Sequence, residues 1–332
     1  MSANRGHTLS RRRLLNVGLL GATSLSVPAL AQSTYPSRPI VLIVPFPPGG
    51  VTDLVGRELA KRLTDALGQS VVVENRAGAG GNIGTAALAK AAPDGHTLGV
   101  MTVSAMSIAP HIHKSLSFQP LKDFTPICNI VNTPGAIVAG LKTPYQNLQD
   151  LIKAAKAAPG RISYASVGLG SLPHLAAEMF AQQAGVQLLH VPYKGAAPAM
   201  QDLLSGVVDL TFESALTNTV THFSQGKLKV LATTGTQRVP ILPQVPCANE
   251  VLPGYAAQGW FGFFGPAGLP APITTRLNEV AVAMLREPAL LERFEKLGIQ
   301  ADPSTPAAFF RYLQEQDRLW AGATKGLNLQ LD

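Results

Sequence analysis

The segment between residues 40 and 67 constrains the fold more than any other part of this chain. Residues 40–44 are all apolar, as in a buried strand, and residues 54–67 have the apolar spacing of an amphipathic helix. The residues between them are Pro45-Phe46-Pro47-Pro48-Gly49-Gly50-Val51-Thr52-Asp53. A strand that breaks into proline and glycine and then opens a helix is typical of α/β proteins. Because the first N–H groups of a helix lack partners within it, this turn is also suited to hold an anion.

The same alternation of strand and helix patterns continues along the chain in two sets. It predicts an α/β protein with two lobes, each a mainly parallel sheet flanked by helices. We expect an N-terminal export segment (1–31), a first lobe (32–130 and 252–332) and a second lobe (131–251). A cleft between two lobes is a common place for a small ligand to bind.

The first 31 residues have the pattern of an export signal. Three arginines follow Ser10, an apolar run covers residues 14–27, and Ala29-Leu30-Ala31 is a cleavage motif. The paired arginines favour the twin-arginine route, and an ordinary secretion signal is the alternative. We expect cleavage near Ala31 and a mature protein in the periplasm. No later apolar run approaches the ~20 residues needed to span a bilayer, so we expect no insertion in the membrane.

The net charge says little about partners once the export segment is set aside. The chain has 27 basic and 20 acidic residues, a formal charge of +7. Four arginines and no acid lie in the first 31 residues, so the remainder has 23 basic and 20 acidic residues, or +3. Blocks of basic residues interleaved with aromatics are missing, and we therefore expect no nucleic acid partner.

Motifs for cofactors and metals are also missing. The glycines of residues 78–84 approach a dinucleotide fingerprint, but Ile83 stands where its last glycine is required. The two cysteines, Cys128 and Cys247, either form a disulfide in an oxidising compartment or are separate buried thiols. Without a cluster of histidines they are poor metal ligands, so we expect neither a metal nor a cofactor.

A second turn of the same kind follows the strand pattern of residues 163–166. It contains Gly168 and Gly170, and Pro173 suits the first turn of the helix that follows. Two such helix starts that face one cleft would hold a carboxylate from both sides. In the first turn, Thr52 and Asp53 serve either as helix caps or as ligand contacts, Asp53 by accepting a ligand ammonium.

A hydrolase would have to use Ser171 and His174 of the second turn. A single histidine on a helix of apolar residues is more often structural than catalytic, and the Gly-x-Ser-x-Gly elbow is missing. Several anion-binding turns without a nucleophile or a metal set favour binding over catalysis. A secreted acyl hydrolase that uses Ser171 and His174 is the alternative.

Taken in order, the motifs from residue 35 to residue 332 resemble those of the Bug/TctC family, the receptors associated with tripartite tricarboxylate transporters. They are residues 45–50 with Asp53, residues 74–76 with 78–84, residues 122–127, residues 168–174, residues 190–195 with 197–199, and residues 259–262 with 266–268. The resemblance implies a periplasmic-binding-protein fold of the type II-like, Venus-flytrap kind without enzymatic activity. It also implies that the protein, as a monomer, captures a small carboxylate for uptake by a membrane transporter. Signalling to a membrane sensor kinase is the alternative to transport.

The resemblance further implies which residues contact the ligand. They are Phe46, Pro47, Gly49, Gly50, Thr52, Asp53, Ser104, Ala105, Gly168, Gly170, Ser171, His174, Gly195, Pro198 and Glu213. Glu213 stands where relatives often have the shorter Asp, and residues 105–110 lack a His and an Asn that relatives usually carry. These departures affect the identity of the carboxylate, which the sequence does not give.

Overall fold

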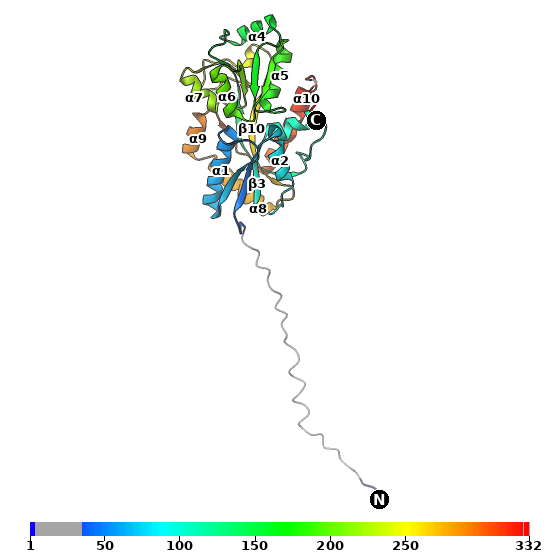
Figure 1. The fold of residues 1–332 in the computed structure, drawn as a ribbon. Coiled ribbons are helices and arrows are strands. Elements are labelled where there is room, and N and C mark those ends of the chain that lie inside the picture. The colour runs from blue at the N-terminus through cyan, green and yellow to red at the C-terminus, as the bar shows by residue number, and fades with distance from the viewer. Residues whose placement is uncertain (4–34, 328, 332) are drawn as a thin grey trace. The chain divides into compact units, whose positions relative to one another are not determined.

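The computed structural model describes residues 1–3, 35–327 and 329–331. The predicted export signal lies outside these residues apart from its first three. Residues from Tyr35 onward form one compact unit, in which strands and helices alternate as the sequence predicts (Figure 1). None of the described helices has the length and apolar character needed to cross a bilayer.

The strands and helices have the following bounds. The strands are β1 (Ile40–Val44), β2 (Val71–Asn75), β3 (Thr97–Thr102), β4 (Phe124–Pro134), β5 (Ala136–Gly140), β6 (Ser163–Ser166), β7 (Leu189–Pro192), β8 (Leu210–Glu213), β9 (Leu228–Thr233), β10 (Gln258–Pro266) and β11 (Gln300–Ala301). The α-helices are α1 (Val51–Leu67), α2 (Asn82–Ala89), α3 (Ala109–Ile112), α4 (Leu148–Ala157), α5 (Leu172–Ala184), α6 (Ala196–Ser205), α7 (Thr217–Ser224), α8 (Ala271–Met284), α9 (Pro288–Glu295) and α10 (Pro306–Thr324). Short turns of other helix types are η1 (Ala79–Gly81), η2 (Ser104–Ile108) and η3 (Ala248–Glu250).

Helix α1 shows how local sequence produces these elements. Val55, Leu59 and Leu63 recur every four residues and are fully buried, so one face of the helix packs on the sheet. The helix ends at Gly68, whose φ of 68° is left-handed and whose N–H donates to the carbonyl of Thr64.

The strands form two mixed sheets, with the orders β11-β4-β10-β3-β1-β2 and β7-β6-β8-β5-β9. In the first sheet β1 is parallel to β2 and β3, whereas β10 is antiparallel to β3 and β4. In the second sheet β6 is parallel to β7 and β8, whereas β5 is antiparallel to β8 and β9. The prediction of an α/β protein is confirmed, but the sheets are not mainly parallel. The first strand after each crossing, β5 in the second sheet and β10 in the first, runs against the strand–helix–strand units of its sheet.

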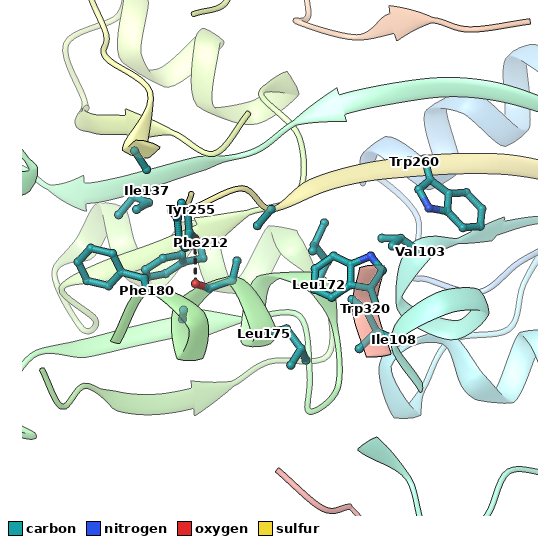
Figure 2. Packing of buried hydrophobic residues seen from close by; sticks show 14 of the residues in the cluster. Val103, Ile108, Ile137, Leu172, Leu175, Phe180, Phe212, Tyr255, Trp260 and Trp320 are labelled. Atoms are coloured by element: carbon teal, nitrogen blue, oxygen red, sulfur yellow. Dashed lines mark hydrogen bonds between the residues drawn. The ribbon is translucent and has the colours of Figure 1, made fainter. Parts of the chain in front are cut away.

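Three apolar clusters form the core. One packs α1, α8 and α9 on the first sheet, and another packs α6 and α7 on the second. The largest continues from the first sheet to the second. Figure 2 shows Leu172 and Leu175 of α5 between Trp260 and Trp320 on one side and Phe212 on the other. The lobes therefore share part of their core.

The two cysteines lie in different parts of the structure, and both are free and buried. Cys128 is in β4, where burial raises the pKa of its thiol to about 11. Of the two alternatives for the cysteines, the structure has separate buried thiols.

Gly135 marks the crossing from the first sheet to the second. It joins β4 directly to β5, and the return crossing lies within residues 234–257. A Cβ atom on Gly135 would overlap the carbonyl oxygen of Glu213 and lie 2.7 Å from Oγ1 of Thr234. The lobe limits given above, between residues 130 and 131 and between 251 and 252, stay a prediction.

We predict that Gly135→Ala lowers the free energy of unfolding by about 1–3 kcal/mol, because the backbone must shift to admit the methyl group. Urea unfolding of the purified variant measures this. Gly322→Ala is the matched control, because the position is exposed, lies in α10 and has no atom within 4 Å of the added Cβ. We expect no loss in the control, since alanine is the better helix former. Equal stability of the two variants would contradict the packing seen at Gly135.

Candidate functional site

A cavity of about 240 Å³ lies where the loops of the two sheets meet. Its wall from the first lobe consists of the turn after β1, the start of α1 and the end of β3. Its wall from the second lobe consists of the loop before α5, the start of α6 and Ser214. Residues 259–261 of β10, the strand that enters the first sheet after the return crossing, complete the lining.

The turn after β1 is held by hydrogen bonds to Asp53. Oδ2 of Asp53 accepts from the N–H of Gly49 (3.1 Å) and from Nε of Arg57 (2.9 Å), and Oδ1 accepts from Nδ2 of Asn75 (3.0 Å). Burial raises the pKa of Asp53, but these hydrogen bonds outweigh it and hold the pKa below its ordinary value. Gly49 has φ of 91°, a conformation that favours glycine. Asp53 does not line the cavity, which favours the structural interpretation of this residue over an ammonium contact.

The starts of α1 and α6 both line the cavity, one from each lobe. In α1 the first helical bond runs from the N–H of Leu54 to the carbonyl of Gly50, which leaves the preceding amides without a helical acceptor. In α6 the first amides are those of Ala196 and Ala197, and Pro198 has no N–H group. Neither helix has a side-chain cap among the described residues. The lining therefore includes two helix starts whose first amides have no acceptor among the described residues.

The start of α5 has a different role from the one expected from its sequence. Four amides of its glycine loop are bonded within the protein: Gly168 N to Ser166 Oγ, Gly170 N to His174 Nδ1, Ser171 N to Gly168 O, and Leu172 N to Ser104 Oγ. Of this segment, Val167, Leu172 and Pro173 line the cavity. The amide partner of α1 across the cavity is thus α6, not α5.

The hydrogen bond between Ser104 and Leu172 joins the two lobes. Oγ of Ser104, at the start of η2, accepts from the N–H of Leu172 at 3.0 Å, and both residues are buried. The lobes also meet at Gly195, where an added Cβ would lie 3.1 Å from Cγ of Pro47. Ala105, which follows Ser104 in the chain, is fully buried in the core and does not line the cavity.

Ser171 and His174 do not bond to each other. Oγ of Ser171 donates to the carbonyl of Gly168 at 2.6 Å, whereas Nδ1 of His174 accepts from the N–H of Gly170 at 3.2 Å. Neither residue lines the cavity. This geometry gives no support to the hydrolase alternative.

His174 instead belongs to a stack of three rings that the sequence did not reveal. Its ring lies 4.3 Å from that of His190, which lies 4.8 Å from that of Tyr164. Oγ of Ser166 lies 2.7 Å from Nε2 of His190. Burial lowers the pKa of both histidines to about 4, so both are neutral at pH 7. The two histidines therefore contribute to the structure of the glycine loop before α5, since His174 accepts from Gly170 and His190 lies against Ser166.

Glu213 also lies beside the cavity and not in its wall, whereas the next residue, Ser214, is part of the lining. Oε1 of Glu213 accepts from Oγ1 of Thr211 at 2.8 Å. Burial raises the pKa of Glu213 from 4.5 to about 7, and the hydrogen bond from Thr211 opposes this shift.

The expected contact residues therefore fall into two groups. Those that line the cavity are Phe46, Pro47, Gly50, Thr52, Ser104, Gly195 and Pro198. Those that lie outside the lining are Gly49, Asp53, Ala105, Gly168, Gly170, Ser171, His174 and Glu213. Sequence reasoning missed other apolar residues of the lining, which include Leu172, Trp260 and Phe261. The motif at residues 259–262 was the available signal for the last two. The described residues contain no group of three or more His, Cys, Asp or Glu placed to hold a metal ion.

We predict that Ser104→Ala lowers the free energy of unfolding by about 1–3 kcal/mol, because the buried N–H of Leu172 loses its acceptor. Urea unfolding measures the loss. Ser107→Ala is the matched control, since Ser107 is in the same turn, is fully buried, and has no hydrogen-bond partner for its Oγ among the described residues. We expect little or no loss there, and an equal loss in both variants would show that the bond between the lobes is unimportant.

We predict that Glu213→Gln becomes increasingly stabilising as the pH rises from about 4.5 to about 7. The folded-state pKa lies above that of the unfolded chain, so folding is disfavoured once the unfolded chain has released this proton. Melting temperatures of the variant and the unmodified protein should therefore agree near pH 4.5 and separate by pH 8. Glu295→Gln, at an exposed position of α9, is the matched substitution for comparison. A difference independent of pH would contradict the raised pKa.

The comparisons with known proteins agree on one family. The family model described as tripartite tricarboxylate transporter family receptor, TctC, matches residues 55–329. The protein BugT of Bordetella pertussis is 37% identical over 322 residues, which are 96% of this chain and 98% of that protein.

Two solved structures share the fold closely. The R. palustris protein Rpa4515 with adipate has a TM-score of 0.85 and 32% identity, and the match covers 89% of this chain and 99% of that one. MatC from Rhodopseudomonas palustris with bound malate has a TM-score of 0.84 and 30% identity, over 88% of this chain and 100% of that one. The expected two-lobed fold of periplasmic binding proteins is thereby confirmed. The chain belongs to the TctC/Bug family of periplasmic solute-binding receptors, which are not enzymes.

Proposed function

We propose that this protein captures a small organic acid between its lobes and holds the carboxylate at the starts of α1 and α6. The observation that carries the proposal is that both sets of unpaired amides line one cavity from opposite lobes. Amides at helix starts bind anions because the helix dipole is positive there. The lining residues that the structure describes include no Asp or Glu, so no described residue of the wall repels the carboxylate by charge. The adipate and malate in the two related structures support this class of ligand.

The magnitudes are adequate for a receptor. A hydrogen bond to a charged group contributes roughly 1.5–3 kcal/mol. Four such bonds, less the free energy lost on closure, reach the ~8 kcal/mol of micromolar binding. A ligand that contacts both helix starts binds the closed arrangement better than an open one and therefore stabilises closure.

The same proposal places the protein in the periplasm as a monomer. Its export segment directs it through the twin-arginine route and is removed near Ala31. The receptor then delivers its ligand to the membrane subunits of a tripartite tricarboxylate-type transporter. A thermal-shift screen with mono-, di- and tricarboxylates tests the binding step. If none of these acids raises the melting temperature, the proposed binding is rejected.

We predict that Gly50→Ala weakens binding of the carboxylate found in that screen at least ten-fold. Gly50 has φ of −89°, and an added Cβ meets no atom within 4 Å, so the fold tolerates alanine with a loss of about 1 kcal/mol or less. The methyl group would occupy space beside the first amides of α1. Titration calorimetry measures the affinity, with Gly322→Ala as the control that leaves the cavity unchanged. Undiminished affinity in Gly50→Ala would exclude α1 as the carboxylate site.

A further inference from the structure

The groups of the cavity wall that attract an anion are two helix starts and one lysine, and they lie together at one end. A Cβ on Gly195 would nearly touch Pro47, so the turn before α1 and the start of α6 are adjacent. Lys194, which directly precedes this start, is the single charged residue among the described residues of the lining, and its side chain is exposed. One carboxylate at this end meets both helix dipoles and a cation.

The rest of the wall carries no charge. Its apolar residues include Val103, Val167, Leu172, Trp260 and Phe261, and all of these except Val167 are buried. Oγ of Ser104 already accepts a hydrogen bond from the N–H of Leu172.

This wall also has uncharged polar groups, among them the hydroxyl of Ser214. Oγ1 of Thr102 and Nε1 of Trp260 are buried, and neither has a hydrogen-bond partner among the described residues. Such atoms can donate hydrogen bonds to one uncharged oxygen of a ligand. A second carboxylate in this part would lose its water without gaining a cation, and the nearby Glu213 would add a like charge when ionised.

We infer that the ligand is a monocarboxylate whose body is uncharged and mainly apolar, which distinguishes this receptor from the relative that binds the dicarboxylate adipate. The inference rests on the proposed function, since it assumes that the carboxylate lies at the starts of α1 and α6. The cavity of about 240 Å³ sets the size. At about 30 Å³ for each water it replaces about eight waters, which corresponds to an acid of about eight to ten non-hydrogen atoms.

Hexanoate and adipate form a matched pair for the test, because they share a six-carbon chain and differ in the second carboxylate. We expect hexanoate to bind the full mature protein at least ten-fold more tightly than adipate in titration calorimetry at pH 7.5. Equal or tighter binding of adipate would overturn the inference and leave the proposed function standing. If neither these two acids nor any other carboxylate binds, the proposed function itself fails.

A variant separates the charge of the wall from its shape. Val167 is half-buried at the edge of the cavity, so a long side chain can be placed there without disrupting the core. We expect Val167→Lys to raise the affinity for adipate relative to hexanoate at least ten-fold, by supplying the cation that the second carboxylate lacks. Val167→Gln, with a similar length and no charge, should leave the ratio unchanged. The same ratio in both variants would show that charge does not set the selectivity.

Discussion

The unpaired amides at the starts of α1 and α6 are the constraint on which the rest of the site depends. A helix leaves its first N–H groups without acceptors, and burying them without a partner is unfavourable. Here neither start has a side-chain cap among the described residues, and the two starts line one cavity from opposite lobes. The surrounding groups keep these amides available. Both carboxylate oxygens of Asp53 accept hydrogen bonds, from Gly49, Arg57 and Asn75. Asp53 therefore fixes the turn without capping the helix. Pro198 removes one amide that would otherwise need an acceptor.

The third helix start near the cavity, that of α5, joins the lobes. Its first amide donates to Oγ of Ser104, and its side chain Leu172 belongs to the apolar cluster that continues across both sheets. Opening the lobes at this point would expose a buried N–H and break an apolar contact, so the closed arrangement has stabilising interactions of its own. A ligand that adds contacts at α1 and α6 acts in the same direction. In the proposed function, closure and binding are therefore linked through neighbouring but different helix starts.

Local sequence patterns were sufficient for much of the fold. The ends of helices α4 and α6 follow from local sequence, because a proline–glycine pair or a glycine stops each of them. The buried turn η2 and helix α7 were not predicted, since residues 104–112 and 217–224 combine apolar and hydroxyl residues without a clear helical period. The antiparallel strands were missed for another reason. Their direction depends on where the chain crosses between the two sheets, which no local pattern records. Within the site, the motifs located the turns, but the apolar lining from β10 lies more than 200 residues from the first turn.

The two glycine turns show what such a motif does and does not determine. Both follow a strand, contain glycines and open a helix, and both therefore supply backbone amides at one place. Whether those amides remain free depends on the side chains nearby. The second turn is flanked by Ser166 and His174, whose Oγ and Nδ1 accept two of its N–H groups, and Ser104 from the other lobe accepts a third. The first turn has an acid, Asp53, in the corresponding place on its helix. That acid accepts from the amide of Gly49, two residues before the first residue of α1, and leaves the first amides of the helix free. A hydroxyl or imidazole that accepts the N–H groups of a glycine turn thus argues against an anion site there, because it satisfies the amides that an anion would need.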